Sequence, residues 1–159
     1  MKDVDREPRE SLSVEPATAE DVPVVKAMID AAYSKYIERI GKPPAAMTME
    51  HGELVKAGGV HVLRLGERVV GSVHIAKQGD SLLVDNLVVD PSLQGRGYGR
   101  VLMEFAESRA RARNLPALTL FTNVKMHENI ALYRKIGFEE TGRRSEDGFA
   151  RVYFRKNLT

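Results

Sequence analysis

Apolar residues recur every three or four positions between Asp21 and Gly41. This spacing predicts one amphipathic helix, which Thr18 or Asp21 caps and which Gly41 and the prolines after it end. Before the helix, the alternation of apolar and polar residues around Leu12 predicts a short first strand. After the prolines, a second and shorter helix is predicted, with Thr48 as its N-cap and the next pair of glycines at its end.

The rest of the chain reads as strands interrupted by two helices. Residues 82–89 are apolar at odd and even positions alike, except for Asp85 and Asn86, which is typical of a central strand covered on both faces. Gly137 is expected to end the last helix in a left-handed conformation, and Phe138 to fold back onto that helix. The strands are predicted at residues 60–65, 68–77, 82–89, 117–122, 138–144 and 149–156, and the helices at 101–113 and 129–136.

This order of elements predicts an α/β fold, a single-domain mixed β-sheet flanked by helices. The order is strand, two helices, three strands, helix, strand, helix and two strands. The domain is predicted to cover residues 11–159, and the charged residues 1–10 are expected to form a disordered tail. A chain of 159 residues is long enough for one domain with a sizeable core.

Composition excludes several kinds of site. The chain has no cysteine, so it has no disulfide framework, thiolate metal site or cysteine nucleophile. Its net charge is +2 and its basic residues are spread along the chain, so charge gives no argument for nucleic acid or a membrane as partner. No histidine spacing matches a metal site, although His61 and His74 are expected on paired strands and could share a face. The charged N-terminus is unlike a signal peptide, and a cytoplasmic protein is expected.

The strongest chemical signal lies between a predicted strand and a predicted helix, in the stretch Gln94 to Arg100, which reads QGRGYGR. Glycines let a backbone approach a ligand closely, and the free amides at a helix N-terminus favour an anion. Arg96 and Arg100 add positive charge. The segment therefore predicts a pyrophosphate site, but not the dinucleotide pattern G-x-G-x-x-G, because Arg100 occupies the third glycine position.

A second run, from Asn129 to Phe138, places Asn129 and Tyr133 four positions apart, on one face of a predicted helix. The pattern [QR]-x-x-G-x-[GA] that begins at Gln94, followed by this run, resembles the two acetyl-CoA segments of the GNAT N-acetyltransferase superfamily. The second segment has the shorter N-x-A-x-Y spacing. The resemblance is strong between Leu82 and Phe138, and elsewhere it rests on the order of elements.

The resemblance implies acetyl-CoA as co-substrate and transfer of an acetyl group to a primary amine. It implies that the backbone of residues 87–89 pairs with the pantetheine arm, and that the amides of residues 94–99 hold the pyrophosphate together with Arg100. It also implies that the Asn129 side chain bonds the pantetheine and that Tyr133 faces the sulfur. The cofactor-binding residues implied in this way are Leu87, Val88, Val89, Gln94, Gly95, Arg96, Gly97, Tyr98, Gly99, Arg100 and Asn129.

Acetyl transfer needs one group that protonates the leaving thiolate and another that takes a proton from the amine. Tyr133 suits the first role, because a tyrosine of pKa about 10 can donate to a thiolate whose thiol has a pKa of about 8.5. Asp85 suits the second role if burial raises its pKa. It suits equally well a structural carboxylate held by backbone amides or one at a strand edge, and a water-mediated route without a single base stays open.

The acceptor pocket is expected along the first two helices. Tyr33 and Tyr36 share a helix face, Arg39 follows three positions later, and all three are predicted substrate residues, although both tyrosines could instead pack on the sheet. Four arginines near the C-terminus are interpreted as a solvated strand face rather than as a site for an anionic substrate. These are Arg143, Arg144, Arg151 and Arg155.

The length of the chain favours a small-molecule amine as acceptor, because it leaves no room for an additional peptide-binding module. Acetylation of a protein or peptide amine is the alternative within the enzyme class. A non-catalytic acetyl-CoA sensor is the alternative from another class. The sequence leaves open whether the protein forms a homodimer.

Overall fold

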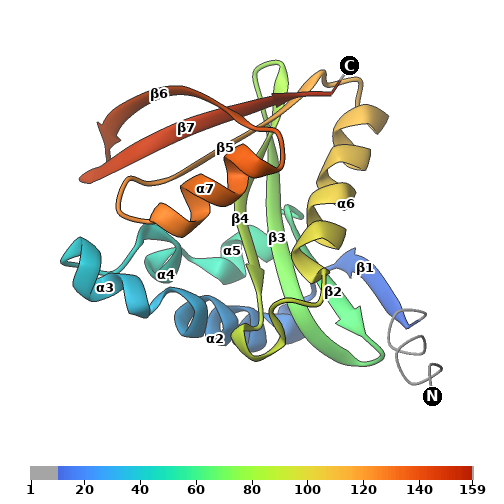
Figure 1. Ribbon diagram of the computed structural model, residues 1–159. Helices are drawn as coiled ribbons and strands as arrows, with labels where there is room; N and C mark the ends of the chain where they lie inside the picture. The colour runs from blue at the N-terminus through green and yellow to red at the C-terminus, as the bar shows by residue number, and fades with distance from the viewer. Residues whose placement is uncertain (1–10, 159) are drawn as a thin grey trace.

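A computed structural model describes residues 11–158 as one sheet flanked by helices (Figure 1). The expected tail, residues 1–10, lies outside the described residues. The strands are β1 Leu12–Pro16, β2 Val60–Leu65, β3 Arg68–Gln78, β4 Ser81–Val89, β5 Ala117–Asn123, β6 Glu139–Glu146 and β7 Phe149–Asn157. They follow the spatial order β1-β2-β3-β4-β5-β7-β6, and all neighbours are antiparallel except β4 and β5. The predicted mixed sheet is confirmed.

The first predicted helix is divided in two, and a short helix that was not predicted, α4 (Ala45–Thr48), precedes the second. The first breaks at Ser34, where the Ile37 amide bonds the Ser34 carbonyl at 3.1 Å, a tighter turn than that of an α-helix. The predicted capping role of Thr48 is wrong, because Thr48 ends one helix, Met49 is extended, and Glu50 is the N-cap of the next. The helices are α2 Val22–Tyr33, α3 Lys35–Ile40, α4 Ala45–Thr48, α5 His51–Lys56, α6 Tyr98–Ala112 and α7 His127–Lys135, with short 3₁₀ turns η1 Ala19–Asp21 and η2 Pro91–Leu93.

The helices cover both faces of the sheet, as the pattern of β4 predicts. Leu102 and Ala106 of α6 are fully buried in the core on one face. Val25 and Ile29 of α2 are buried in the core on the other face, which also contains Val88 of β4. Within residues 11–158, no helix has both the length and the apolar composition that crossing a lipid bilayer requires.

Strand β4 contains a β-bulge at Asp85. The pairing of β3 with β4 shifts between His74 and Ile75, which leaves Asp85 without an opposite residue. An extra residue reverses the alternation of a strand, and Val84 before the bulge and Val89 after it accordingly face the same core. The bulge therefore contributes to the apolar character of β4 at both odd and even positions.

Strands β4 and β5 are joined at one end and separate at the other. Their parallel register covers only Ser81 to Leu83 of β4. Beyond that point β4 stays paired with β3 as far as Val89, and β5 stays paired with β7 as far as Asn123. Figure 1 shows the two strands diverging, with α7 beside the opening. The fold thus leaves a split in the sheet between its two central strands.

Candidate active site

The loop from Gln94 to Gly97 leads into the first turn of α6. Gly95 and Gly97 have φ values of 87° and 85°, a left-handed conformation that residues with side chains rarely adopt. Among the described residues, no backbone or side-chain acceptor bonds the amides of residues 95–100. These amides lie at the positive end of a 15-residue helix, so the loop is suited to an anion. Tyr98 is only 6% exposed, so its backbone rather than its side chain is available to a ligand.

A cavity of about 900 Å³ extends from this loop along β4 to α7. It brings together every residue that the sequence resemblance assigns to the cofactor. In this cavity, Leu87 to Val89 pair with β3 on one side and, among the described residues, with no strand on the other. Their free backbone groups can pair with an extended ligand chain as a neighbouring strand would.

Helix α7 supplies two polar side chains to the same cavity. The Asn129 amide donates to the thioether of Met126 at 3.6 Å, a weak acceptor, and so retains capacity for a ligand. Phe138 folds back onto Tyr133 as predicted, with 5.9 Å between the ring centroids. Burial, with a smaller effect from nearby Tyr36, raises the pKa of Tyr133 to about 12. The Tyr133 hydroxyl therefore stays protonated at physiological pH.

A second cavity, of about 310 Å³, adjoins the first. Tyr33, Leu87, Asn129 and Tyr133 line both cavities, so the two meet at these four residues. The smaller cavity is at the lower end of the range for small-molecule sites. The arrangement can bring an extended anionic ligand and a small second ligand together beside Tyr133.

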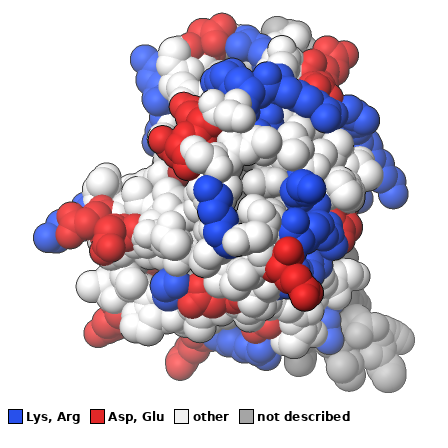
Figure 2. Space-filling view, turned by 90° about the vertical axis from the view of Figure 1, so that its left-hand side faces the viewer, with Lys and Arg blue, Asp and Glu red and all other residues white. Residues whose placement is uncertain are grey.

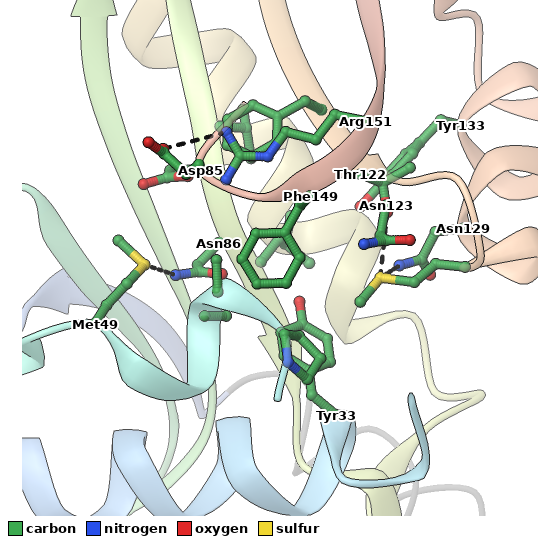
Figure 3. Close-up of a pocket in the computed structure, with 18 residues that line it drawn as sticks. Tyr33, Met49, Asp85, Asn86, Thr122, Asn123, Asn129, Tyr133, Phe149 and Arg151 are labelled. Carbon is green, nitrogen blue, oxygen red and sulfur yellow. Dashed lines mark hydrogen bonds and ion pairs between the residues drawn. The ribbon is translucent and has the colours of Figure 1, made fainter. Parts of the chain in front are cut away.

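The walls of the smaller cavity come from widely separated parts of the chain. Met49 has an extended backbone between α4 and α5, and its thioether accepts a hydrogen bond from the Asn86 amide at 3.4 Å. Figure 3 shows the ring of Phe149 between Arg151 on one side and Tyr33 on the other. The cavity is lined by Tyr33, Pro44, Ala45, Ala46, Met49, Val84, Asp85, Asn86, Leu87, Phe121, Thr122, Asn123, Met126, Asn129, Tyr133, Asp147, Phe149 and Arg151.

The bulge places Asp85 on the wall of this smaller cavity. Its Oδ2 lies 3.0 Å from Nδ1 of His74, and the two side chains are 16% and 14% exposed. The His74 ring packs tightly on the backbone of Gly59, where an added Cβ would lie 2.9 Å from the ring. The partner of Asp85 is therefore an imidazole, whereas the sequence suggested either no partner or backbone amides.

His61 and His74 lie on paired strands, as predicted, but do not share a sheet face. His74 pairs with Val60 across the β2–β3 ladder. His61 pairs with Val73, which is the next position along, so the two rings point to opposite faces. His61 packs against Phe105 of α6, with 4.7 Å between the ring centroids.

The three predicted substrate residues lie in different places. Tyr33 lines the smaller cavity, whereas Tyr36 is 3% exposed and lines only the larger one. Arg39 lines neither cavity and donates to both carboxylate oxygens of Glu128, at 2.8 and 3.1 Å, and to the Lys125 carbonyl at 3.0 Å. This hydrogen-bonded pair lowers the pKa of Glu128 to about 2. Arg39 thus ties α3 to the start of α7.

The arginines near the C-terminus do not form one solvated surface. Arg143 pairs with Glu140 and Arg155 with Asp80, but Arg151 is 8% exposed and lines the smaller cavity. The solvated-face interpretation is therefore wrong for Arg151. Its burial follows from the aromatic neighbours that β5 and β7 bring to it, which no local pattern reveals. The site residues that sequence reasoning missed are Met49, His74, Asn86, Phe121, Phe149 and Arg151 as a cavity residue.

Comparison of this chain with known sequences identifies the protein family to which it is similar. The sequence model of the acetyltransferase (GNAT) family matches residues 25–138. Peptidyl-lysine N-acetyltransferase YjaB of Escherichia coli is 39% identical over 75 residues, which are 47% of this chain and 48% of that protein. IAA acetyltransferase of Azospirillum brasilense is 42% identical over 72 residues, which are 45% of this chain and 47% of that protein. Each match thus spans about half the length of these curated relatives.

Solved structures share the fold. Ard1 from Thermoplasma volcanium has a TM-score of 0.74 at 17% identity, over 94% of this chain and 99% of that one. The PaiA N-acetyltransferase from Thermoplasma acidophilum, solved in complex with coenzyme A, has a TM-score of 0.70 at 13% identity, over 93% and 99%. The family model covers most of the chain, and the split sheet with its glycine loop lies within the matched residues. The chain belongs to the acetyltransferase (GNAT) family.

Proposed function

We propose that this protein is an N-acetyltransferase that transfers an acetyl group from acetyl-CoA to a primary amine while both are bound. The observation that carries the proposal is the meeting of two cavities at Tyr33, Leu87, Asn129 and Tyr133. The larger cavity suits a long anionic ligand, and the smaller suits the acceptor. Membership of the GNAT family supports the same chemistry.

The residues of the larger cavity fit acetyl-CoA. The amides of residues 95–100 have no acceptor among the described residues, and Arg96 and Arg100 stand beside them, as a pyrophosphate requires. The open edge of β4 matches the amide-bearing pantetheine arm, and the Asn129 amide can bond that arm from α7. The fit uses backbone groups for most of the contact, so it depends on the glycines that keep the loop open.

Acetyl-CoA supplies the activated acetyl group. The amine nitrogen forms a bond to the thioester carbonyl carbon, and the bond between that carbon and sulfur breaks. The substrate ammonium loses two protons in all, of which one ends on the thiolate and the other is released to solvent. Tyr133 is our proton donor for the thiolate, because it lines both cavities and its pKa of about 12 keeps its hydroxyl protonated. Asp85, with His74 behind it, is our proton acceptor on the amine side.

Thermal unfolding with and without acetyl-CoA tests the proposal, followed by an assay for free thiol with a panel of amines. A ligand that binds only the native state must raise its stability, so the melting temperature should rise with acetyl-CoA concentration. Amine-dependent release of thiol should follow. An unchanged melting temperature at a high excess of acetyl-CoA would contradict the cofactor site. Binding of acetyl-CoA without release of thiol for any amine would favour a sensor.

A protein or peptide amine is the second candidate for the acceptor. The name of the Escherichia coli relative, a peptidyl-lysine N-acetyltransferase, favours it. In that case the smaller cavity would hold only the end of a side chain or the first residue of a peptide. Comparing lysine-containing peptides with free amines in the same thiol assay separates the two candidates.

A further inference from the structure

We propose that the acceptor is a small amine that also carries a carboxylate, and that Arg151 binds this carboxylate in the smaller cavity. The proposal rests on the acetyltransferase function proposed above and narrows its substrate class to that of amino acids and related aminocarboxylates. It comes from the surroundings of Arg151, a buried cation whose charge the protein itself satisfies only in part.

The guanidinium of Arg151 is held in place mainly by aromatic rings. Its carbon lies 4.3 Å from the ring centroid of Phe121 and 5.9 Å from that of Phe149, and its side chain is 9% exposed. Stacking orients the guanidinium plane but uses none of its five N–H donors. Donors that stacking leaves free favour a ligand that supplies acceptors.

The carboxylates near Arg151 are poor partners. Glu146 accepts from Arg151 at 3.3 Å, which is long for a bond between charged groups, and it also accepts from the Tyr153 hydroxyl. Asp147 lies 3.9 Å away, beyond hydrogen-bond distance. Both carboxylates belong to the exposed hairpin, at 48% and 77% exposure. A planar carboxylate inside the cavity could bond Arg151 through two parallel hydrogen bonds and would be better shielded from water.

The free donors of Arg151 are accessible rather than sealed in the core. Arg151 lines the cavity, and none of its nitrogens is among the fully buried atoms that lack a partner in residues 11–158. Within that part of the chain it is the only cation on the cavity wall, and Asp85 supplies a carboxylate on the same wall. One small molecule with an ammonium and a carboxylate matches this distribution of charge.

The geometry also orients such a molecule. Arg151 and Tyr33 lie on opposite sides of the Phe149 ring in Figure 3, and Tyr33 is one of the residues at the junction of the cavities. A carboxylate at Arg151 therefore leaves the amine directed towards the junction. The outer face formed by the ends of α3 and the β6–β7 hairpin carries mixed charges around an uncharged area (Figure 2). That face offers no surface of single sign for a highly charged macromolecule, which favours a small acceptor.

The test compares amines that differ only in the carboxylate. Phenylalanine is paired with phenethylamine, leucine with isoamylamine, and γ-aminobutyrate with propylamine, all at saturating acetyl-CoA with thiol release as the readout. We expect kcat/KM to be about 10- to 100-fold higher for at least one aminocarboxylate than for its partner, as for a charged hydrogen-bonded pair. Equal or lower values for all aminocarboxylates, or a preference for peptide amines, would overturn the proposal.

Variants locate the effect at Arg151. Arg151→Gln should raise KM for the preferred aminocarboxylate about 10- to 100-fold and should change that of its decarboxylated partner far less. Arg143→Gln removes a positive charge from an exposed position outside the cavity, so it should change neither of these two KM values. Asp147→Asn removes a negative charge that competes for Arg151, so it should lower KM for the preferred aminocarboxylate by about 2- to 5-fold. Asn keeps the left-handed backbone of this position, where φ is 55°, so this variant stays informative if Arg151→Gln unfolds.

Calorimetry separates this proposal from the function on which it rests. The preferred aminocarboxylate is titrated into protein that already holds CoA, so that it can bind but no acetyl group can be transferred. The Arg151→Gln variant should show no heat of binding in the same titration. Failure of acetyl-CoA to bind would refute the proposed function. Acetyl-CoA binding and turnover of simple amines, with no effect of the carboxylate or of Arg151→Gln, would refute the substrate class alone.

Discussion

The two cavities that meet at Tyr133 are built in different ways. The larger one draws its longest run of lining residues from one segment, residues 87–101, where it offers free backbone amides and carbonyls. The smaller one draws side chains from α2, the α4 region, β4, β5, α7 and the β6–β7 hairpin. The first is therefore a property of local chain conformation, and the second is a property of how distant elements pack.

This difference predicts separate kinetic effects. Changes in the larger cavity should alter acetyl-CoA binding, changes in the smaller cavity should alter the use of the amine, and changes at the junction should alter the rate of transfer alone. Four substitutions, two of them paired with a comparison variant, test that separation.

The largest effect is expected at the junction. Tyr133→Phe keeps the ring that packs on Phe138 and removes only the hydroxyl, so kcat should fall by about 10²- to 10⁴-fold while both KM values stay nearly constant. Because the pKa of Tyr133 is about 12, the wild-type rate should not decline through pH 10 from ionisation of this group. A kcat within a few-fold of wild type, with chemistry rate-limiting, would remove the proton-donor role.

On the amine side, Asp85→Asn should lower kcat/KM for the amine by roughly 10²-fold if the carboxylate accepts the proton. His74→Asn breaks the same 3.0 Å contact but leaves the carboxylate in place, so it should lower the rate much less. Steady-state kinetics and thermal melts of both variants measure this. Equal losses of rate and stability in the two would instead show that the pair is structural.

In the larger cavity, Gly97→Asp should weaken acetyl-CoA binding by about 100-fold, because it brings a negative charge to the pyrophosphate site. Gly97→Asn is the matched control: it has the same size, tolerates the left-handed conformation at φ 85° about as well, and carries no charge. Calorimetry should therefore show that the Gly97→Asp variant binds acetyl-CoA much more weakly than the Gly97→Asn variant does. Equal affinities in two folded variants would contradict the loop assignment.

The smallest effect is expected from Arg39→Gln. The loss of the tie between α3 and α7 should raise KM for acetyl-CoA by about 2- to 5-fold, since Asn129 loses support, and leave KM for the amine unchanged. An increase in the amine KM alone would instead restore Arg39 as a substrate residue.

The pH dependence of this tie follows from the pKa of Glu128, which falls from 4.5 to about 2 in the folded protein. The contribution of the pair is therefore fully present above about pH 4.5 and is lost as the pH falls towards 2. The effect of Arg39→Gln should accordingly be constant between about pH 6 and 9. A marked change within that range would show that another group controls the tie.

The sequence by itself determined the mixed sheet, the glycine loop and the pairing of Asn129 with Tyr133 on one helix face. Each depends on residues close together in the chain: alternation within a strand, positive φ at Gly95 and Gly97, and a spacing of four on a helix. The larger cavity could be predicted for this reason, because a loop followed by a helix N-terminus presents backbone groups whichever side chains surround it.

Only the tertiary structure decided the smaller cavity. The bulge at Asp85 cannot be read from β4 alone, because it is a shift in pairing with β3 that reverses which side chains face the core. The contact of Asp85 with His74 and the burial of Arg151 against Phe121 likewise join strands far apart in the sequence. Side-chain recognition depends on which residues meet, and local propensity does not contain that information.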